Sequence, residues 1–537
     1  MLKVDTHQGS FYCSSWSVLK GMTGMTLSNV GVSASRQLGA LLLRGRELAR
    51  CKGEAVLVGG TVPVPEPVDP ISLFGKGWVR NEKVFFWAKA GGRFGLVGLG
   101  QAAAMEEHGQ DEGDEADRVV NADRCEKLFR SWQKWLSAGL REGPREPGLG
   151  PVLLGGFSFD PLKASSPLWR DFPGVCFVLP EYLYTWREDQ GWLSVNRFVL
   201  PQDEETELMA WAEQGWRWVQ EGDLRQPSGM HGGLADGAPA HGTAADMQDA
   251  RADLQEWLQG RGLSVHERDP ETWKRAVRQV AKEIRDGHLK KVVLARDLVL
   301  KAEQPFFPAV ILEALRQRQG RDCYLFAVRR GASCFLGATP ERLVEVERQE
   351  VRATCLAGSV ARGKTPAEDE RLGALLLADA KNRAEHAVVA EMLREALAPS
   401  CSALEVPAEP VLMKLRDIQH LYTPVTGRLR PGHHLLTLVK ALHPTPAVGG
   451  YPREAALARI RELEQMDRGW YAAPVGWLDS EGNGEFAVAI RSALIREDEA
   501  VLFAGCGIMG NSDPQEEWEE TRLKMFPMLY AIGSAGR

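Results

Sequence analysis

Apolar and polar positions alternate in short runs over the first 220 residues, and this pattern predicts strands separated by turns. Turn sequences such as AGGR and EDQG lie within or beside these runs. Two longer stretches, residues 123–139 and 205–220, are predicted to be helices. The predicted strands are residues 54–60, 83–100, 150–160, 175–186 and 192–200.

Helix signals are sharper in the second half of the chain. Asp269 and Pro270 open a segment whose apolar residues recur every three or four positions up to Ile284, which predicts a capped amphipathic helix. One long helix is predicted over residues 366–397. The last helix opens at Asp513, with a glutamate at the capping-box position.

Strand signals lie between these helices. Thr339 and Pro340 predict a short helical turn after the first of two hairpins. Strand pairs separated by helices predict large antiparallel sheets with helices on their outer faces. The predicted strands and hairpins cover residues 290–300, 323–338, 343–358, 484–495 and 500–509.

Two of the predicted helices carry acidic residues on one face. Glu385 follows Asn382 by three residues in the long helix, and Glu517, Glu520 and Lys524 share a face of the last helix. Two such helices facing each other can hold a hard cation through carboxylate oxygens. Most acidic residues on amphipathic helices are solvated surface instead, so the spacing alone leaves both interpretations open.

Composition divides the chain into regions. Residues 221–263 are rich in Gly, Ala and Pro and show no apolar period, which predicts a linker or surface insertion. They separate an N-terminal α/β region, residues 1–220, from a region over residues 264–537. A chain of 537 residues can bury a large core.

Charge and cysteine content argue against several classes of protein. The net charge is −7 and no long Lys/Arg run is present, whereas a nucleic-acid surface needs a basic stripe. No apolar run reaches transmembrane length, and the N-terminal residues lack the apolar core of a secretory signal. The nine cysteines are scattered without a CxxC motif, which predicts reduced thiols in a cytoplasmic protein. We therefore expect no nucleic-acid or membrane partner.

Two residues are candidates for acid–base chemistry. Lys291 begins an apolar strand, where burial can lower the pKa of an ammonium and make it a general base. Glu341 follows a strand in GATPERL, where burial can keep a carboxylic acid protonated. The alternatives are a solvated lysine at a strand end and a first-turn glutamate that suits the helix dipole.

Cationic and small residues near the C-terminus can bind an anion. The small residues of AGCG, at positions 504–507, allow backbone N–H groups to approach a negative charge. Arg491 is flanked by apolar residues and is expected to point inward from a strand, where it needs an anionic or carbonyl partner. The alternative for Lys524 is a simple ion pair with Glu520 one turn away. Together with the acidic faces, these groups fit acid–base chemistry on a small carboxylate with Mg²⁺.

The order of motifs in the second half resembles the chorismate-utilising enzymes, a family that includes isochorismate, anthranilate, aminodeoxychorismate and salicylate synthases. The resemblance is specific over about residues 266–530 and weak over the first 220, where GGFSFD resembles the long isochorismate synthases of menaquinone synthesis. It implies an α+β fold, layered α/β/β/α, with two large, mainly antiparallel central sheets to which the N-terminal region also contributes strands. The motifs are KVVLAR, GATPERL, CLAGS, DAKNRAEHAVV, IQHLYTPVTG, LHPTPAVGG, PVGWLDSEGNGEFAVAIRSA and AGCGIMGNSDPQEEWEETRLK.

The resemblance also implies a role for each candidate. Lys291 matches the lysine that activates water for attack at C2 of chorismate, and Glu341 matches the glutamate that protonates the departing C4 hydroxyl. These roles require a neutral lysine and a protonated glutamate near neutral pH. The implied Mg²⁺ ligands are Glu385, Glu520 and Glu517. The implied substrate-binding positions are Arg491, Tyr471, Gly505, Gly507, Lys524, His420, Ser359, Gly358 and Ala447.

Within the family, two positions favour isochorismate synthase. Ala447 stands where anthranilate- and salicylate-forming relatives have threonine, and Ser359 in LAGS is more similar to isochorismate synthases than to the amine-forming enzymes. Cys506 departs from the usual alanine of AGAG. No glutamine-amidotransferase segment is recognisable, so we expect no amidotransferase subunit. The sequence carries no signal for oligomeric state, and a monomer is the default expectation. The alternatives are a salicylate synthase, an isochorismate synthase of siderophore synthesis, and a catalytically silent chorismate-binding protein.

Overall fold

The structure is a computed structural model of the chain. It describes residues 27–80, 82–89, 91–107, 124–163, 165–221, 254–319, 321, 323–414 and 418–535. Most of the segment predicted to be a linker, residues 222–253, lies outside the described residues. Its last part contains the short helix α7 (Leu254–Gln259).

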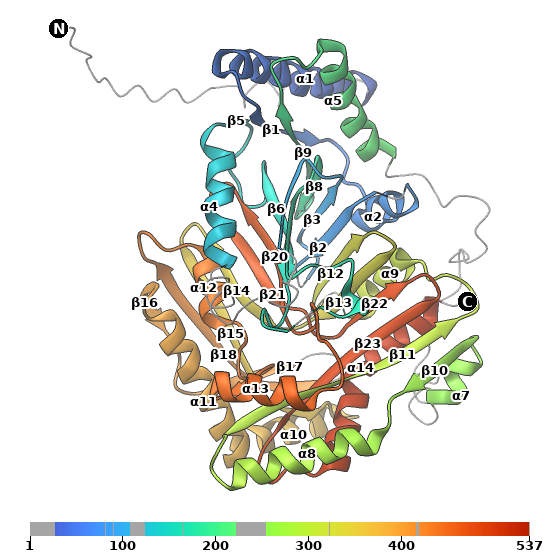
Figure 1. Ribbon diagram of the computed structural model, residues 1–537, viewed down its shortest axis with the longest axis vertical. Helices are drawn as coiled ribbons and strands as arrows, with labels where there is room; N and C mark the ends of the chain where they lie inside the picture. The colour runs from blue at the N-terminus through green and yellow to red at the C-terminus, as the bar shows by residue number, and fades with distance from the viewer. Residues whose placement is uncertain are drawn as a thin grey trace, which may run out of the picture.

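A sheet of 13 strands forms one of the two central layers (Figure 1). Among its described neighbours only β1 and β5 run parallel, and the other pairs are antiparallel. In spatial order the strands are β10 (Leu263–Glu267), β11 (Lys291–Ala302), β23 (Glu499–Ile508), β22 (Ser492–Arg496), β13 (Ser333–Thr339), β12 (Tyr324–Arg330), β2 (Val84–Ala88), β3 (Phe94–Leu99), β8 (Tyr182–Arg187), β9 (Gln190–Val199), β1 (Val56–Val64) and β5 (Leu140–Glu142), while β19 (Gly450–Tyr451) also pairs with β11.

A second sheet of 10 strands forms the other central layer. In β15 buried and partly exposed positions alternate from Val351 to Ala357, as expected for a strand with one face on a core. In order its strands are β16 (Cys401–Glu405), β18 (Ile418–Leu429), β15 (Glu350–Ala361), β14 (Arg342–Glu347), β21 (Gly484–Val488), β20 (Pro474–Asp479), β6 (Val152–Phe157), β7 (Val175–Leu179) and β4 (Ala103–Glu107), while β17 (Val411–Lys414) pairs with β18.

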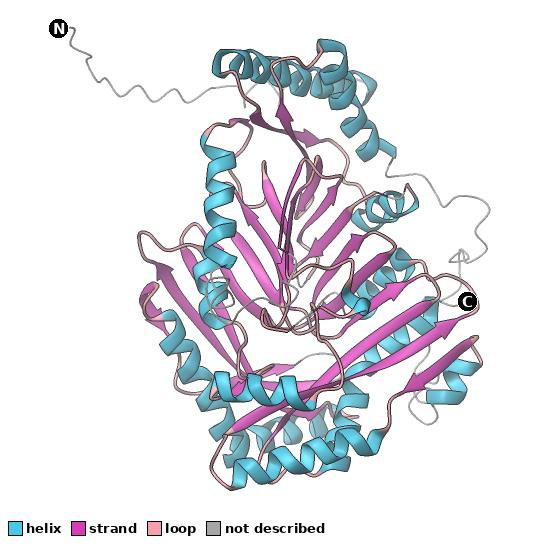
Figure 2. Ribbon diagram, viewed as in Figure 1, coloured by secondary structure: helices cyan, strands magenta, loops and turns pink. Residues whose placement is uncertain are grey.

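Helices lie at the periphery of both sheets (Figure 2). Helices α1, α9 and α14 pack on strands of the 13-stranded sheet, and α11 and α12 pack on strands of the other. The predicted α+β layered architecture is thereby confirmed. Besides α7, the described α-helices are α1 (Leu27–Lys52), α2 (Pro70–Val79), α4 (Arg124–Ser137), α5 (Glu205–Gln220), α8 (Pro270–Arg285), α9 (Pro308–Gln319), α10 (Pro366–Ala378), α11 (Ala380–Leu397), α12 (Leu435–Leu442), α13 (Arg453–Leu463) and α14 (Pro514–Ala535).

In each sheet the strands of the second half of the chain form one block and those of the first half form another, and the two blocks pair at a single boundary. Strand β2 pairs with β12, where Ala88 lies opposite Leu325. Strand β6 pairs with β20, where Gly156 lies opposite Val475. Aromatic side chains such as Trp87 are fully buried in this shared core.

Helix caps explain one correct prediction and one error. Asp269 accepts hydrogen bonds from the backbone N–H of Glu271 at 3.2 Å and Thr272 at 3.1 Å, and α8 begins where it was predicted to begin. The single helix predicted over residues 366–397 is wrong, because the chain leaves helical geometry at Asp379 (φ −71°, ψ 112°). The Asp379 carboxylate caps a new helix, α11, by accepting from the Asn382 N–H at 2.7 Å.

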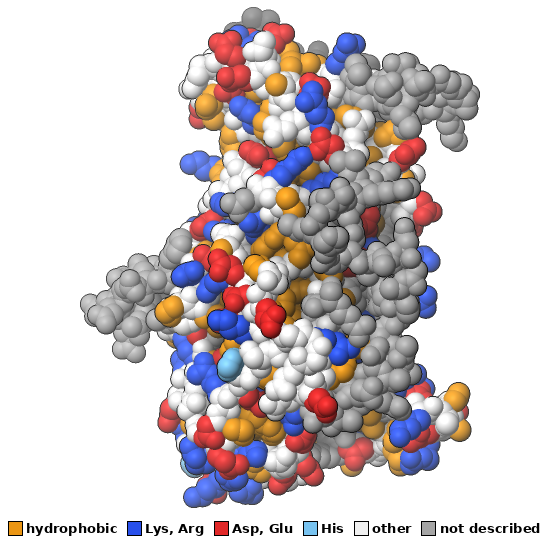
Figure 3. Space-filling view, turned by 90° about the vertical axis from the view of Figure 1, so that its right-hand side faces the viewer, with side chains coloured by type: hydrophobic (Ala, Val, Ile, Leu, Met, Phe, Trp, Pro, Cys, Tyr) orange, Lys and Arg blue, Asp and Glu red, His pale blue; other side chains and the backbone are white. Residues whose placement is uncertain are grey.

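Positive and negative side chains are intermixed on the molecular face in Figure 3. Among the described residues, no helix is both long and apolar enough to cross a membrane.

Candidate active site

A cavity of about 280 Å³ lies where strands of both sheets meet the N-terminal part of α14. The sequence-predicted residues that line it are Lys291, Glu341, Gly358, Ser359, His420, Ala447, Tyr471, Arg491, Gly505, Gly507, Glu517, Glu520 and Lys524. Glu385 belongs to α11, and its side chain lies outside the described part of the structure. Residues that are more than 200 positions apart in the sequence thus share one cavity.

Lys291 is the first residue of β11 and is only 8% exposed. Strand β11 pairs with β23, with Val293 opposite Gly507. A Cβ atom on Gly507 would lie 2.6 Å from Cε of Lys291 and 3.2 Å from its Nζ. The glycine therefore leaves the space that the lysine side chain occupies.

Glu341 lies in a two-residue link between β13 and β14, so the predicted helical turn is wrong. Thr339 Oγ1 donates to the Val488 carbonyl at 2.6 Å and accepts from the Glu341 N–H at 3.2 Å. These bonds fix the position of the short link between the two sheets. Burial raises the pKa of Glu341 to about 7, although the nearby cations Lys291 and Lys524 act in the opposite direction.

Arg491 lies between two strands, and the prediction of one strand over residues 484–495 is also wrong. Strands β21 and β22 belong to different sheets, and Arg491 occupies the crossing with φ 52°. Its carbonyl accepts from the Ala338 N–H at 3.1 Å. The side chain still lines the cavity, as predicted, but from a turn in left-handed geometry rather than from a strand.

The acidic face of α14 borders the same cavity. Glu517 accepts from Ser512 Oγ at 2.6 Å, and Lys524 Nζ contacts Glu520 at 2.6 Å and the Gly505 carbonyl at 3.0 Å. Burial and the charge of Glu520 raise the pKa of Glu517. Burial is the largest single influence on Glu520 and acts to raise its pKa, but Lys524, Lys291 and Arg491 together outweigh burial, so the pKa of Glu520 is lowered. Lys524 forms the ion pair with Glu520 and also lines the cavity, so its role in binding an anion stays a prediction.

These carboxylates suit a hard cation. Glu517 and Glu520 offer oxygen donors, and a cation between them would offset the like-charge repulsion that contributes to the raised pKa of Glu517. Among the described residues no cluster of three metal-ligating side chains is present. The described chain thus supplies two donors from one helix, and a third has to come from Glu385, from the substrate or from water.

His420 and Ser359 face each other across β15 and β18. Ser359 Oγ lies 2.7 Å from His420 Nδ1. Burial, together with Arg491 and Lys524, lowers the pKa of His420 to about 3, so the ring is neutral at physiological pH. Its Nε2 atom is buried and has no hydrogen-bond partner in the described part of the chain. This nitrogen is therefore available to a ligand in the cavity.

Sequence reasoning missed two polar side chains among the residues that line the cavity. Ser512 precedes α14 and holds Glu517, and Arg468 is 2% exposed. Arg468 stands between an aspartate and the apolar run GWYAAP. A charged residue directly before such a run was the available signal for a buried functional arginine.

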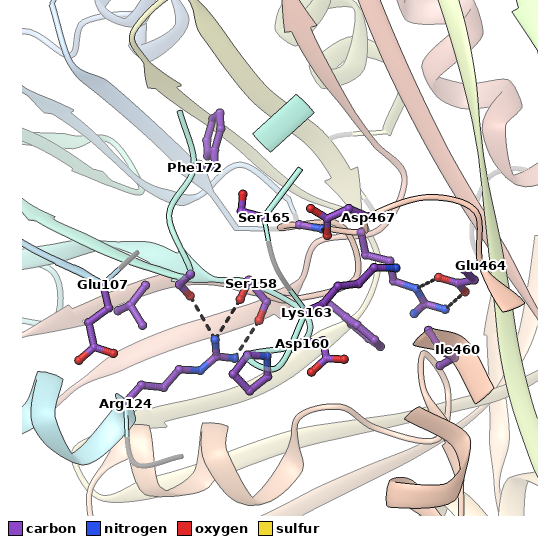
Figure 4. A pocket seen from close by; sticks show the side chains of 16 residues that line it. Glu107, Arg124, Ser158, Asp160, Lys163, Ser165, Phe172, Ile460, Glu464 and Asp467 are labelled. Atoms are coloured by element: carbon purple, nitrogen blue, oxygen red, sulfur yellow. Dashed lines mark hydrogen bonds and ion pairs between the residues drawn. The ribbon is translucent and has the colours of Figure 1, made fainter. Parts of the chain in front are cut away.

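A neighbouring cavity of about 260 Å³ contains none of the predicted site residues. Its charged lining includes Arg124, Asp160, Lys163 and Asp467 (Figure 4). Arg468 lines both cavities and so belongs to the wall between them.

Comparisons with known proteins show the family of this chain. Residues 45–232 and 241–533 match the family model described as "Chorismate binding enzyme". The chain is 35% identical to isochorismate synthase MenF of Bacillus subtilis (strain 168), over 92% of this chain and 98% of that protein. It is 37% identical to the salicylate biosynthesis isochorismate synthase of Pseudomonas aeruginosa (strain PAO1), over 91% of this chain and 92% of that protein.

The fold is also that of solved relatives. The structure of MenF, the menaquinone-specific isochorismate synthase from Escherichia coli, aligns with a TM-score of 0.67 at 24% identity and covers 91% of this chain and 99% of that one. A putative 2,3-dihydroxybenzoate-specific isochorismate synthase, DhbC from Bacillus anthracis, aligns with a TM-score of 0.61 at 26% identity, over 86% of this chain and all of that one. The family model matches most of the chain, and the chain aligns with MenF of Bacillus subtilis over nearly the full length of both proteins. The chain therefore belongs to the chorismate-binding enzymes.

Proposed function

We propose that the protein is an isochorismate synthase, which converts chorismate reversibly to isochorismate. The supporting observation is the single cavity that Lys291, Glu341, Arg491 and the acidic face of α14 share. Two relatives that are 35% and 37% identical over nine-tenths of this chain are named isochorismate synthases, and these names support the same assignment.

The reaction adds a hydroxyl at C2 and removes the hydroxyl at C4, so it needs a base and an acid. In this proposal Lys291 takes a proton from the attacking water. Glu341 gives a proton to the departing C4 hydroxyl, which leaves as water. A pKa of about 7 keeps a large fraction of Glu341 protonated at neutral pH, as an acid of this kind requires.

Anion binding is assigned to the cationic side of the cavity. Arg491, Tyr471, Lys524 and the backbone from Gly505 to Gly507 hold the enolpyruvyl carboxylate in this proposal. His420, neutral and with a free Nε2, lies near the ring as a hydrogen-bonding group rather than as an acid. Ser359 fixes its ring orientation through Nδ1.

Mg²⁺ is the proposed cofactor, and Glu385, Glu520 and Glu517 are its proposed ligands. When bound, it supplies positive charge that neutralises and positions the ring carboxylate. The like charges of Glu517 and Glu520 at the cavity support this assignment.

Product analysis tests the activity. The purified protein is treated with EDTA, dialysed, and incubated with chorismate with and without added Mg²⁺, and the products are separated by HPLC. We expect isochorismate only in the sample with Mg²⁺. Salicylate as the main product would identify a salicylate synthase, and unchanged chorismate would identify a silent binding protein. Ala447 stands where salicylate-forming relatives have threonine, which supports isochorismate as the product.

We assign the product to menaquinone synthesis, with siderophore synthesis as the alternative. End-to-end similarity to long relatives supports this, although one of them is named for salicylate biosynthesis. Complementation distinguishes the two: the gene should restore growth of a bacterial strain that lacks menaquinone-specific isochorismate synthase.

Light scattering tests the further expectations of a monomer without an amidotransferase subunit. The dispersed cysteines support function in the cytoplasm.

A further inference from the structure

Glu464 and Arg468 form a buried ion pair at the end of α13. Their side chains are only 1% and 3% exposed. Arg468 donates through Nε to Glu464 Oε2 at 2.9 Å and through Nη2 to Oε1. Figure 4 shows these two contacts at Glu464. We call this bidentate pair the clasp.

The clasp binds the backbone of β11 where that strand lacks a neighbour. On this edge β11 pairs with β19 at its first two residues and with β10 from Leu298 onward. Between them the Val293 carbonyl accepts from Arg468 Nη2 at 2.9 Å. The Ala295 N–H donates to Glu464 Oε1 at 2.7 Å. The two side chains of the clasp thus take the place of a paired strand two residues beyond Lys291.

The clasp also holds the opposite wall of the cavity. Arg468 Nη1 donates to the Val448 carbonyl at 2.7 Å, and Val448 follows Ala447. The Arg468 carbonyl accepts from the Tyr471 N–H at 2.8 Å. The guanidinium lies 4.2 Å from the ring centroid of Phe159 on the side of the neighbouring cavity. The guanidinium therefore connects the lysine strand to the segment that carries Ala447, and the backbone carbonyl of the same residue holds Tyr471.

We propose that Glu464 and Arg468 are positioning residues that fix Lys291 relative to the bound substrate. This inference rests on the proposed function and adds residues to it. A misplacement of about 1 Å in a reacting group can cost roughly 100-fold in rate. Loss of the clasp removes the contacts of one edge of β11 and of the Val448 carbonyl together. We therefore expect it to disturb the alignment of Lys291 more than it disturbs the anion-binding groups on β23 and α14.

Two conservative variants test the proposal. Glu464→Gln keeps the shape but leaves one acceptor oxygen for three N–H donors, because its amide nitrogen must face a donor. Arg468→Lys keeps the charge but cannot reproduce the planar fork. Arg461→Met is the matched control. Arg461 forms a similar partly buried pair with Asp160 beside the same neighbouring cavity.

The measurements are kcat, KM for chorismate, the Mg²⁺ titration midpoint and the thermal unfolding midpoint. Activity is expressed per amount of folded protein. For E464Q and R468K we expect kcat to fall about 10- to 100-fold. KM and the Mg²⁺ midpoint should stay within threefold of wild type. R461M should keep wild-type kcat. If R468K does not accumulate as folded protein, E464Q decides the question.

A kcat for both variants within threefold of R461M overturns the inference, and so does a raised KM with unchanged kcat. These results require an active wild-type enzyme. A wild-type protein that does not convert chorismate overturns the proposed function itself, together with the inference that rests on it.

Discussion

Replacing Glu341 by glutamine removes the proton that we assign to the leaving hydroxyl and keeps the size of the side chain. The carboxyl has a pKa of about 7, so it is largely protonated at pH 6 and largely ionised at pH 8.5. Glutamine donates no proton of this kind at any pH. We therefore expect kcat to fall by roughly 10²- to 10⁴-fold, whereas wild-type kcat should fall as pH rises through about 7 if Glu341 is the acid.

The same substitution should change how stability depends on pH. A carboxyl whose pKa is raised in the folded state contributes stability below its unfolded pKa, and this contribution is lost as pH rises through the folded pKa. The pKa rises from 4.5 to about 7, which corresponds to about 3.5 kcal/mol at roughly 1.4 kcal/mol per unit, of which about 3 kcal/mol is lost above pH 4.5. Since E341Q has no titrating group at this position, its unfolding free energy relative to wild type should rise by about 3 kcal/mol from pH 4.5 to pH 8.5.

Thermal unfolding of both proteins over this pH range measures the difference. In a chain of this length about 3 kcal/mol corresponds to a shift of roughly 3 °C in Tm. Glu519→Gln, on the exposed side of α14, is the control and should show no such trend. A Tm difference between E341Q and wild type that is independent of pH would refute the burial argument. Retention of more than a tenth of kcat would refute the acid assignment.

Further substitutions test the other groups of the cavity. Lys291→Ala should abolish turnover without changing the thermal midpoint by more than a few degrees, and an unchanged rate would exclude this residue as the base. Glu520→Gln should raise the Mg²⁺ concentration needed for half-maximal activity by at least tenfold, with Glu519→Gln as a control on the same helix; an unmoved titration would remove Glu520 from the ligand set. Gly507→Ala places a Cβ 2.6 Å from Lys291 Cε and should lower kcat at least tenfold. Gly505→Ala, whose Cβ would lie no closer than 3.3 Å to its neighbours, should cost less; equal losses in kinetic assays would contradict this steric explanation.

Local signals and ordered motifs made much of this structure predictable. The cap at Asp269 depends only on neighbouring residues, and α8 begins as expected. The placement of Lys291 and Glu341 in one cavity followed from the family resemblance, since their separation in sequence carries no information about distance. The predicted residues with described side chains all line that cavity.

The errors occur where long-range contacts override local pattern. The helical pattern predicts Asp379 to be an exposed residue within one long helix, but its carboxylate caps the start of a second helix. Arg491 has the apolar neighbours of a strand residue, yet it adopts a positive φ because the chain changes sheets there. Arg468 owes its role to carbonyls of Val293 and Val448, which no local pattern places beside it.

Because the early strands adjoin the late strands at one boundary in each sheet, the N-terminal region covers a sheet edge of the C-terminal region in both sheets. Without residues 1–220, β12 would lose its neighbour β2 and β20 would lose its neighbour β6. Both exposed edges would be long, apolar and otherwise buried, and such edges pair readily with other chains. A fragment of residues 264–537 retains most of the cavity residues, yet we expect it to aggregate through these strands. The early strands thus keep the catalytic half of the chain from self-association.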